Sequence, residues 1–77
     1  MIKAYILITT KASDLRQVIE KAKQIKDLTV ISAVTGVHDL IAVVRVEKIE
    51  DLFDITNQIS DIDGIDRTET AVVTKEL

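Results

Sequence analysis

The chain has 77 residues, a formal net charge of −3 and a hydrophobic content of 47%, with no cysteine and one histidine. This composition excludes disulfides, thiolate metal sites, a cysteine nucleophile and a histidine-cluster metal site within one chain. The acidic balance, with only one tyrosine and one phenylalanine, disfavours direct binding of nucleic acid, which needs a basic surface or stacking aromatics. A chain of this size forms one small domain, which gains most from oligomerisation when disulfides and metals are missing.

The N-terminal end of the sequence runs directly into a strand-like pattern. Its apolar run is short and lacks the small-residue cleavage site of a signal peptide. No stretch of the sequence is long enough to span a bilayer. We therefore expect a cytoplasmic protein that does not bind membranes.

Apolar side chains in the first half of the chain change from an alternating to a helical spacing and back again. Residues Ile2–Thr10 alternate with period two and predict a strand whose two faces are both apolar in the middle. The spacing then predicts a helix over Asp14–Lys26, with Ser13 as its N-cap. Leu28–Thr35 and Leu40–Val46 predict the second and third strands, folded back on each other around a glycine turn.

The second half repeats the pattern and defines the fold class. A second amphipathic helix is expected over Lys48–Ile62, ended by Gly64, and a last strand over Ile65–Thr74. The resulting order, βαββαβ, is the ferredoxin-like arrangement of the α+β class. Right-handed crossovers place both helices on one face of a four-stranded antiparallel sheet. The first and third strands, which are the most apolar, are expected at its centre.

These two central strands are apolar on both faces, although helices cover only one face. The uncovered face would present either Tyr5, Leu7, Ile41 and Val43 or the opposite set. An apolar sheet face of this kind usually marks an interface. We therefore expect a second copy to pack sheet to sheet and form a dimeric α/β sandwich. The alternative is a solvated face that tolerates aliphatic side chains.

The stretch Val30–Leu40 holds the only histidine and one of the two glycines. Gly36 permits a positive φ and the close approach of a ligand, whose carboxylate the adjacent amides could bind. Asp39 could hold an ammonium group. A free amino acid carries both groups, a carboxylate for the amides near Gly36 and an ammonium group for Asp39. A structural interpretation stands beside this one, with Gly36 as a hairpin turn and Asp39 as an acceptor for its own turn amides. His38 could donate to a ligand or stack on it, or could simply be solvated.

Catalysis is not expected from this sequence. No nucleophile is placed beside a base, and no glycine-rich loop could cradle a phosphate, so neither an enzyme nor a cofactor is indicated. A small ferredoxin-like hydrolase would need an arginine-containing anion loop after the first strand, and Thr9–Ala12 contains no arginine. Thr68 and Thr70, on the last predicted strand, could offer hydroxyl groups to a ligand, although threonine is also common in strands for its own sake.

The residues resemble a known family at three places. The sequence V-I-S-A-V-T-G-V-H-D-L over Val30–Leu40 resembles the signature of the Lrp/AsnC (feast/famine) ligand-binding domain, also called the RAM domain. The opening A-Y-I-L-I-T-T fits the first strand of that domain, and the closing G-I-D-R-T-E-T-A-V-V-T fits the last. The resemblance covers residues 1–77 as a single domain.

This resemblance implies a ferredoxin-like fold, sheet-to-sheet dimers that assemble into octamers or similar rings, and a small amino acid effector bound between dimers. The turn of one dimer would face the last-strand threonines of a neighbour. The implied ligand-binding residues are Thr35, Gly36, His38, Asp39, Thr68 and Thr70.

Two departures from the family pattern bear on function. Family members usually carry an N-terminal helix-turn-helix domain, so this sequence resembles a stand-alone module that acts on transcription indirectly and could co-assemble with full-length Lrp/AsnC regulators. His38 also stands where many members have an aromatic residue. Two alternatives are a purely structural oligomerisation module and an ACT-like amino-acid-binding domain. The ACT domain usually places its glycine after the first strand, whereas Gly36 follows the second.

Overall fold

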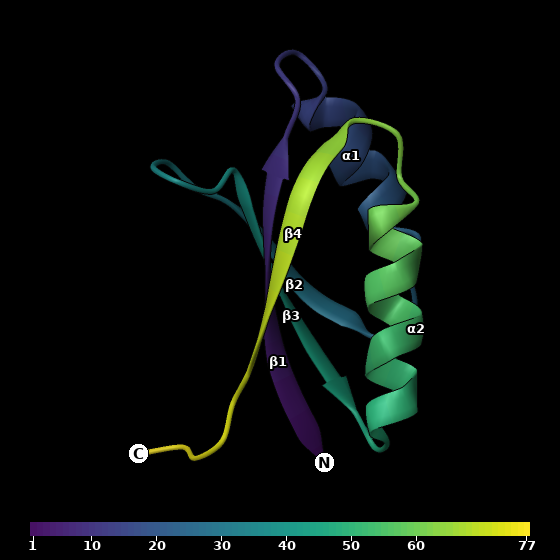
Figure 1. Cartoon of the computed structure of the whole chain (residues 1–77), viewed down its shortest axis with the longest axis vertical. Coiled ribbons are helices and arrows are strands. Elements are labelled where there is room, and N and C mark those ends of the chain that lie inside the picture. Colours follow the sequence, from purple (N-terminus) through teal and green to yellow (C-terminus); the bar gives the residue numbers. More distant parts are fainter.

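The computed structural model describes all 77 residues and contains the expected order of strands and helices. The elements are β1 (Ile2–Thr10), α1 (Leu15–Ala22), β2 (Leu28–Ala33), β3 (Leu40–Val46), α2 (Ile49–Ser60) and β4 (Ile65–Val72). The four strands are antiparallel in the order β2-β3-β1-β4, and both helices lie on one side of the sheet (Figure 1). The ferredoxin-like α+β prediction is therefore confirmed, with β1 and β3 at the centre.

The first helix is shorter than its apolar spacing predicted, and it begins differently. It ends at Ala22 rather than at Lys26, because tighter three-residue turns follow and lead to Asp27 at φ +75°. Ser13 has φ +76° and is not the N-cap; Asp14 takes that position, and its side chain makes no capping hydrogen bond. Apolar spacing thus predicted the helix correctly. It did not predict where the helix ends, because the turn that follows keeps the same face toward the core.

Three of the remaining elements, β2, α2 and β4, also end or begin one or two residues away from the predicted bounds. β2 ends at Ala33 instead of Thr35, because the Val34 amide donates to the Asp39 carbonyl at 2.9 Å and closes the hairpin loop. α2 is one residue shorter at its start and two at its end than predicted, and β4 stops at Val72 rather than Thr74. β1 and β3 have the predicted bounds.

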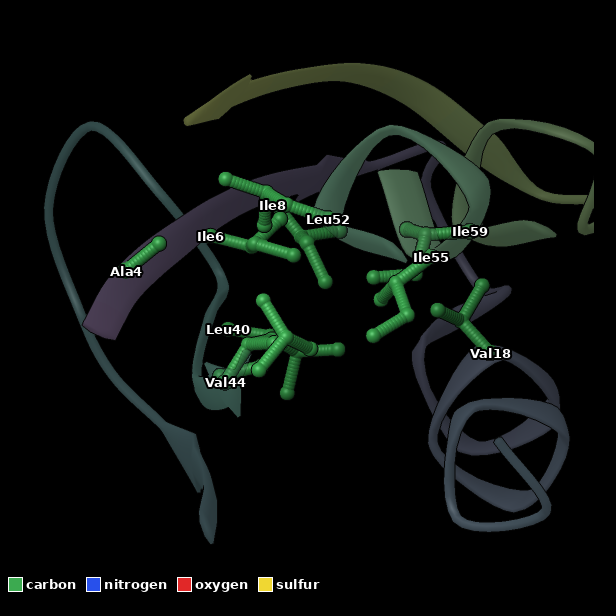
Figure 2. Close-up of a cluster of buried hydrophobic side chains, with 11 residues drawn as sticks. Ala4, Ile6, Ile8, Val18, Leu40, Val44, Leu52, Ile55 and Ile59 are labelled. Carbon is green, nitrogen blue, oxygen red and sulfur yellow. The ribbon is translucent and has the colours of Figure 1, made fainter. Parts of the chain in front are cut away.

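The hydrophobic core lies between the sheet and the two helices. Alternate residues of β1 and β3 are fully buried on this side, and side chains from both helices pack onto them (Figure 2). No polar or charged side chain is buried. Each fully buried aliphatic side chain contributes about 1.5–3 kcal/mol through removal from water. The core cluster consists of Ala4, Ile6, Ile8, Val18, Leu40, Ala42, Val44, Val46, Leu52, Ile55 and Ile59.

Gly64 joins α2 to β4 at the point where this connection crosses the start of α1. Its φ is +101°, and its carbonyl accepts a 2.8 Å hydrogen bond from the Lys11 amide. A Cβ added here would lie 2.9 Å from the Asp14 Cβ and 3.1 Å from a Val18 methyl group. The expected left-handed glycine is present, although α2 has already ended at Ser60 and the glycine serves the turn beyond it.

Substitution of the two glycines should separate backbone strain from steric overlap. Gly64→Ala should lower the free energy of unfolding by about 2–4 kcal/mol, because strain and overlap add. Gly36 has φ +110° but nothing within 4 Å of an added Cβ, so Gly36→Ala should cost about 1–2 kcal/mol from strain alone. Urea denaturation of both variants measures the difference, and equal losses would contradict the role assigned to the Asp14 contact.

Candidate functional site

The loop of residues 34–39 between β2 and β3 projects from the sheet on the side away from the helices (Figure 1). Gly36 lies at its exposed tip with φ +110°, between the exposed residues Thr35 and Val37. The positive φ expected from the sequence is therefore present. An added Cβ at Gly36 would meet open space, so no other part of the chain crowds the tip of the loop.

Asp39 is held by β1 rather than by its own turn. Its amide donates to the Ile8 carbonyl at 2.9 Å. Its Oδ2 accepts hydrogen bonds from the Thr10 amide at 2.8 Å and from the Thr10 hydroxyl at 3.2 Å. The structural interpretation from sequence, an aspartate that satisfies amides of its own turn, is thus replaced by a bond between two elements 29 residues apart.

His38 turns inward, so that its imidazole lies over the end of β1. Nδ1 is 3.4 Å from the Thr9 hydroxyl, and Nε2 is 3.8 Å from a carboxylate oxygen of Glu69 on β4. Only 20% of the His38 side chain is exposed. The ring therefore bridges the loop to the edge strand, and a protonated imidazole would add charge assistance to the Glu69 contact.

The two threonines of β4 lie on the other side of the sheet. Thr68 pairs with Ile8 and Thr70 pairs with Ile6. Since directly opposed residues of neighbouring strands share a face, both threonines lie on the helix-covered side, Thr68 partly buried and Thr70 exposed. The structure brings His38 and Asp39 together at the end of β1 but does not bring the threonines of the same chain to them.

Thr70 instead borders an apolar groove between α2 and β4. The groove has a volume of about 260 Å³. Phe53 and Ile49 remain 58% and 40% exposed there, although their helical spacing predicts packing onto the core. Helical spacing alone therefore could not have marked the groove. Its lining consists of Ile49, Leu52, Phe53, Thr56, Thr70 and Val72.

The uncovered face of the sheet carries the first of the two predicted apolar sets. Register places Val30, Val43, Tyr5 and Ala71 in one row across the four strands. The next row contains Ser32, Ile41, Leu7 and Glu69. Residues from all four strands therefore form a continuous face with an apolar centre.

The margin of this face is charged. The Lys3 ammonium lies 5.3 Å from the centre of the Tyr5 ring and 3.1 Å from a carboxylate oxygen of Glu76. Hydrogen bonding to Glu76, and to a smaller extent to Tyr5, raises the pKa of Lys3 above its usual range. The last residues of the chain, which follow β4, are thereby tied to β1 on the side away from the helices (Figure 1).

Two further properties bear on the chemistry available to the chain. No group of three or more histidine, cysteine, aspartate or glutamate side chains is placed to hold a metal ion. No helix in the structure has the length and apolar character needed to cross a membrane.

The βαββαβ order, the four-stranded antiparallel sheet and the two helices on one face define a small ferredoxin-like α+β domain, here with a glycine-tipped loop and an apolar open sheet face. The sequence profile of one family of such domains, the Lrp/AsnC ligand binding domain, matches residues 3–77. The chain belongs to this family. A comparison with curated protein sequences gives no match.

Solved structures agree with this assignment. TTHA0845 from Thermus thermophilus is 31% identical, with a TM-score of 0.93 over 100% of this chain and 98% of that one. The protein PHS023 from Pyrococcus horikoshii is 32% identical, with a TM-score of 0.85 over 99% and 93%. E. coli AsnC is 26% identical, with a TM-score of 0.90 over 97% of this chain but 52% of AsnC. The chain thus spans about half the length of AsnC.

Removing the Asp39 carboxylate should destabilise the domain by leaving the Thr10 amide without its partner. We expect Asp39→Ala to lower the free energy of unfolding by about 1–3 kcal/mol. Asp39→Asn, which keeps an acceptor oxygen, should cost about 1 kcal/mol or less. Asp66 is exposed and makes neither a side-chain hydrogen bond nor an ion pair in the structure, so Asp66→Ala is the control. Urea denaturation that showed equal effects at positions 39 and 66 would contradict this interpretation of the Thr10 contact.

Proposed function

We propose that the chain is an amino acid effector-binding and oligomerisation module that acts indirectly on transcription. The observation that carries the proposal is that the predicted ligand-binding residues form two polar groups on opposite sides of the domain. We call these two groups half-sites. Gly36 and Asp39 belong to a loop that projects away from the helices, whereas Thr68 and Thr70 lie on the helix-covered side. Half-sites arranged in this way can face each other only across a boundary between subunits.

Each half-site offers a different part of the recognition chemistry. The amides around Gly36, with Thr35, suit the carboxylate of a free amino acid, and Asp39 suits its ammonium group. His38, which precedes Asp39 in the loop, would add a contact from its imidazole. The Thr68 and Thr70 hydroxyls of a neighbouring subunit would complete the polar contacts.

The groove beside Thr70 indicates the kind of side chain that the site accepts. Four of its six lining residues are apolar, and its volume is about 260 Å³, which is sufficient for an aliphatic or thioether side chain. Feast or famine regulatory protein from M. tuberculosis, which shares the fold at 18% identity and a TM-score of 0.82, is described in complex with L-methionine. We therefore favour an apolar amino acid as effector.

The open sheet face supports the assembly part of the proposal. Its apolar rows, which include Tyr5, Leu7, Ile41 and Val43, would be covered by the same face of a second copy. The resulting dimers would form an octamer or a similar ring through the half-sites, alone or together with full-length Lrp/AsnC regulators. The module would then act in the cytoplasm by changing the assembly of such regulators rather than by binding nucleic acid.

A purely structural oligomerisation module is the second candidate, and one observation favours it. Asp39 already accepts two hydrogen bonds from Thr10, so the loop has a structural reason to contain an aspartate. The family match, together with a glycine after β2 rather than after β1, argues against the ACT-like alternative.

A thermal-shift screen against the twenty amino acids tests effector binding. At about 100 times its Kd, an effector should stabilise the protein by about 2.7 kcal/mol, which corresponds to roughly 10 °C or more for a domain of this size. Apolar amino acids should give the largest shifts, and Asp39→Asn should reduce them. If no amino acid shifts the melting temperature while rings are seen by light scattering, the structural alternative is correct.

The dimer is tested by placing a charge in the middle of the open face. Val43→Glu should convert the dimer to a monomer in size-exclusion chromatography with light scattering, because the carboxylate would be buried without a partner. Leu15 on α1 is also a partly exposed aliphatic residue, 37% exposed, but lies outside the sheet. Leu15→Glu should leave the dimer intact. Dimers that persist in Val43→Glu would show that the open face is not the interface.

A further inference from the structure

We infer that Thr10 is a positioning residue for ammonium recognition, because it commits one oxygen of Asp39 to β1 and leaves the other oxygen for the ligand. The inference rests on the proposed function and adds to it a residue outside the loop, because Thr10 is the last residue of β1. Both hydrogen bonds from Thr10 end on Oδ2 of Asp39, at 2.8 Å from the amide and 3.2 Å from the hydroxyl. No side-chain hydrogen bond of the structure ends on Oδ1.

Thr10 is available for this contact because regular strand pairing ends beside it. Pairing between β1 and β3 stops at Ile8 opposite Leu40, and pairing between β1 and β4 shifts register between Thr9 and Thr10. The Thr10 amide therefore has no partner in the β1–β3 ladder, and a part-buried amide needs one. The Asp39 carboxylate supplies the acceptor that a further residue of β3 would have supplied.

The Asp39 main chain is fixed at the same place, so the carboxylate is held in one orientation. The Asp39 amide donates to the Ile8 carbonyl at 2.9 Å, and the Asp39 carbonyl accepts from the Val34 amide at 2.9 Å. A carboxylate held at its backbone and at one oxygen presents the second oxygen in a defined direction. Such pre-organisation lowers the entropic cost of binding a ligand.

The charge of Asp39 is not used by the fold. The Lys3–Glu76 ion pair and the His38–Glu69 contact do not include Asp39. Neutral donors orient the Asp39 carboxylate but do not neutralise it. An ammonium group bound at Oδ1 would supply the opposite charge through a charge-assisted hydrogen bond.

The experiment compares two ligands that differ only in the ammonium group. Calorimetry on the full chain uses the amino acid that gives the largest thermal shift and its deamino analogue, the carboxylic acid with the same side chain. Thr10→Val should weaken binding of the amino acid about tenfold, the effect of losing an oriented hydrogen bond to a charged group. Binding of the deamino analogue should stay the same, and Thr10→Ser, which keeps the hydroxyl, should behave as wild type.

Thr29→Val is the matched control, because the Thr29 hydroxyl also makes one hydrogen bond, to the Val43 carbonyl at 3.1 Å, at the other end of β2 from the loop. It should change neither affinity. Asp39→Asn keeps an acceptor for Thr10 and loses the charge, so it should abolish the preference for the amino acid. If Thr10→Val does not fold, Thr10→Ala, which also lacks the hydroxyl, decides the question with the same pair of ligands.

Two results would overturn the inference while leaving the proposed function in place. One is an equal loss of affinity for both ligands in Thr10→Val, which would indicate a general structural role for Thr10. The other is an unchanged preference for the amino acid in Thr10→Val or Asp39→Asn. If the wild-type chain binds no amino acid at all, the proposed function fails, and the inference fails with it.

Discussion

The single pairing register between β1 and β3 is the constraint on which the rest of the structure depends. With Ile2 opposite Val46 and Ile8 opposite Leu40, every second residue of both strands enters the core beneath the helices. A shift by one residue would exchange the two faces. Because both faces of this pair are apolar, however, hydrophobicity alone does not choose between them. The side on which the helices pack determines which apolar set enters the core, and the other set remains on the open face.

The same register determines where the candidate site can form. Pairing ends at Ile8 opposite Leu40, so the β2–β3 loop extends beyond the sheet and meets the last two residues of β1. On the other side of β1, the register with β4 turns Thr68 and Thr70 toward the helices. Under the proposed function, each side of the domain would then hold half of a binding site. Assembly would therefore supply both the burial that a short chain lacks and the second half of the site.

Features with a strong local signal could be predicted from the sequence. The alternation in β1 and β3 gave their bounds, and the glycine between the neighbouring apolar runs of β2 and β3, Gly36, marked the tip of the loop at φ +110°. The end of α1 could not be predicted, because Ile25 keeps the helical spacing although the chain has already entered a turn. The role of Thr10 could not be predicted either. Its contact with Asp39 joins residues 29 positions apart, and it exists only because strand pairing stops between them.

The carboxylate of Asp39 can serve the fold and a ligand at once because the two roles use different properties of the side chain. Closing the loop onto Thr10 requires an acceptor oxygen, which an asparagine would also provide. Binding an ammonium group requires negative charge, which only the carboxylate provides. The contact with Thr10 accounts for an acceptor at this position, whereas the negative charge has no cation partner within the chain. The unpaired charge of Asp39, more than the shape of the turn, is therefore the reason to regard this loop as a binding element.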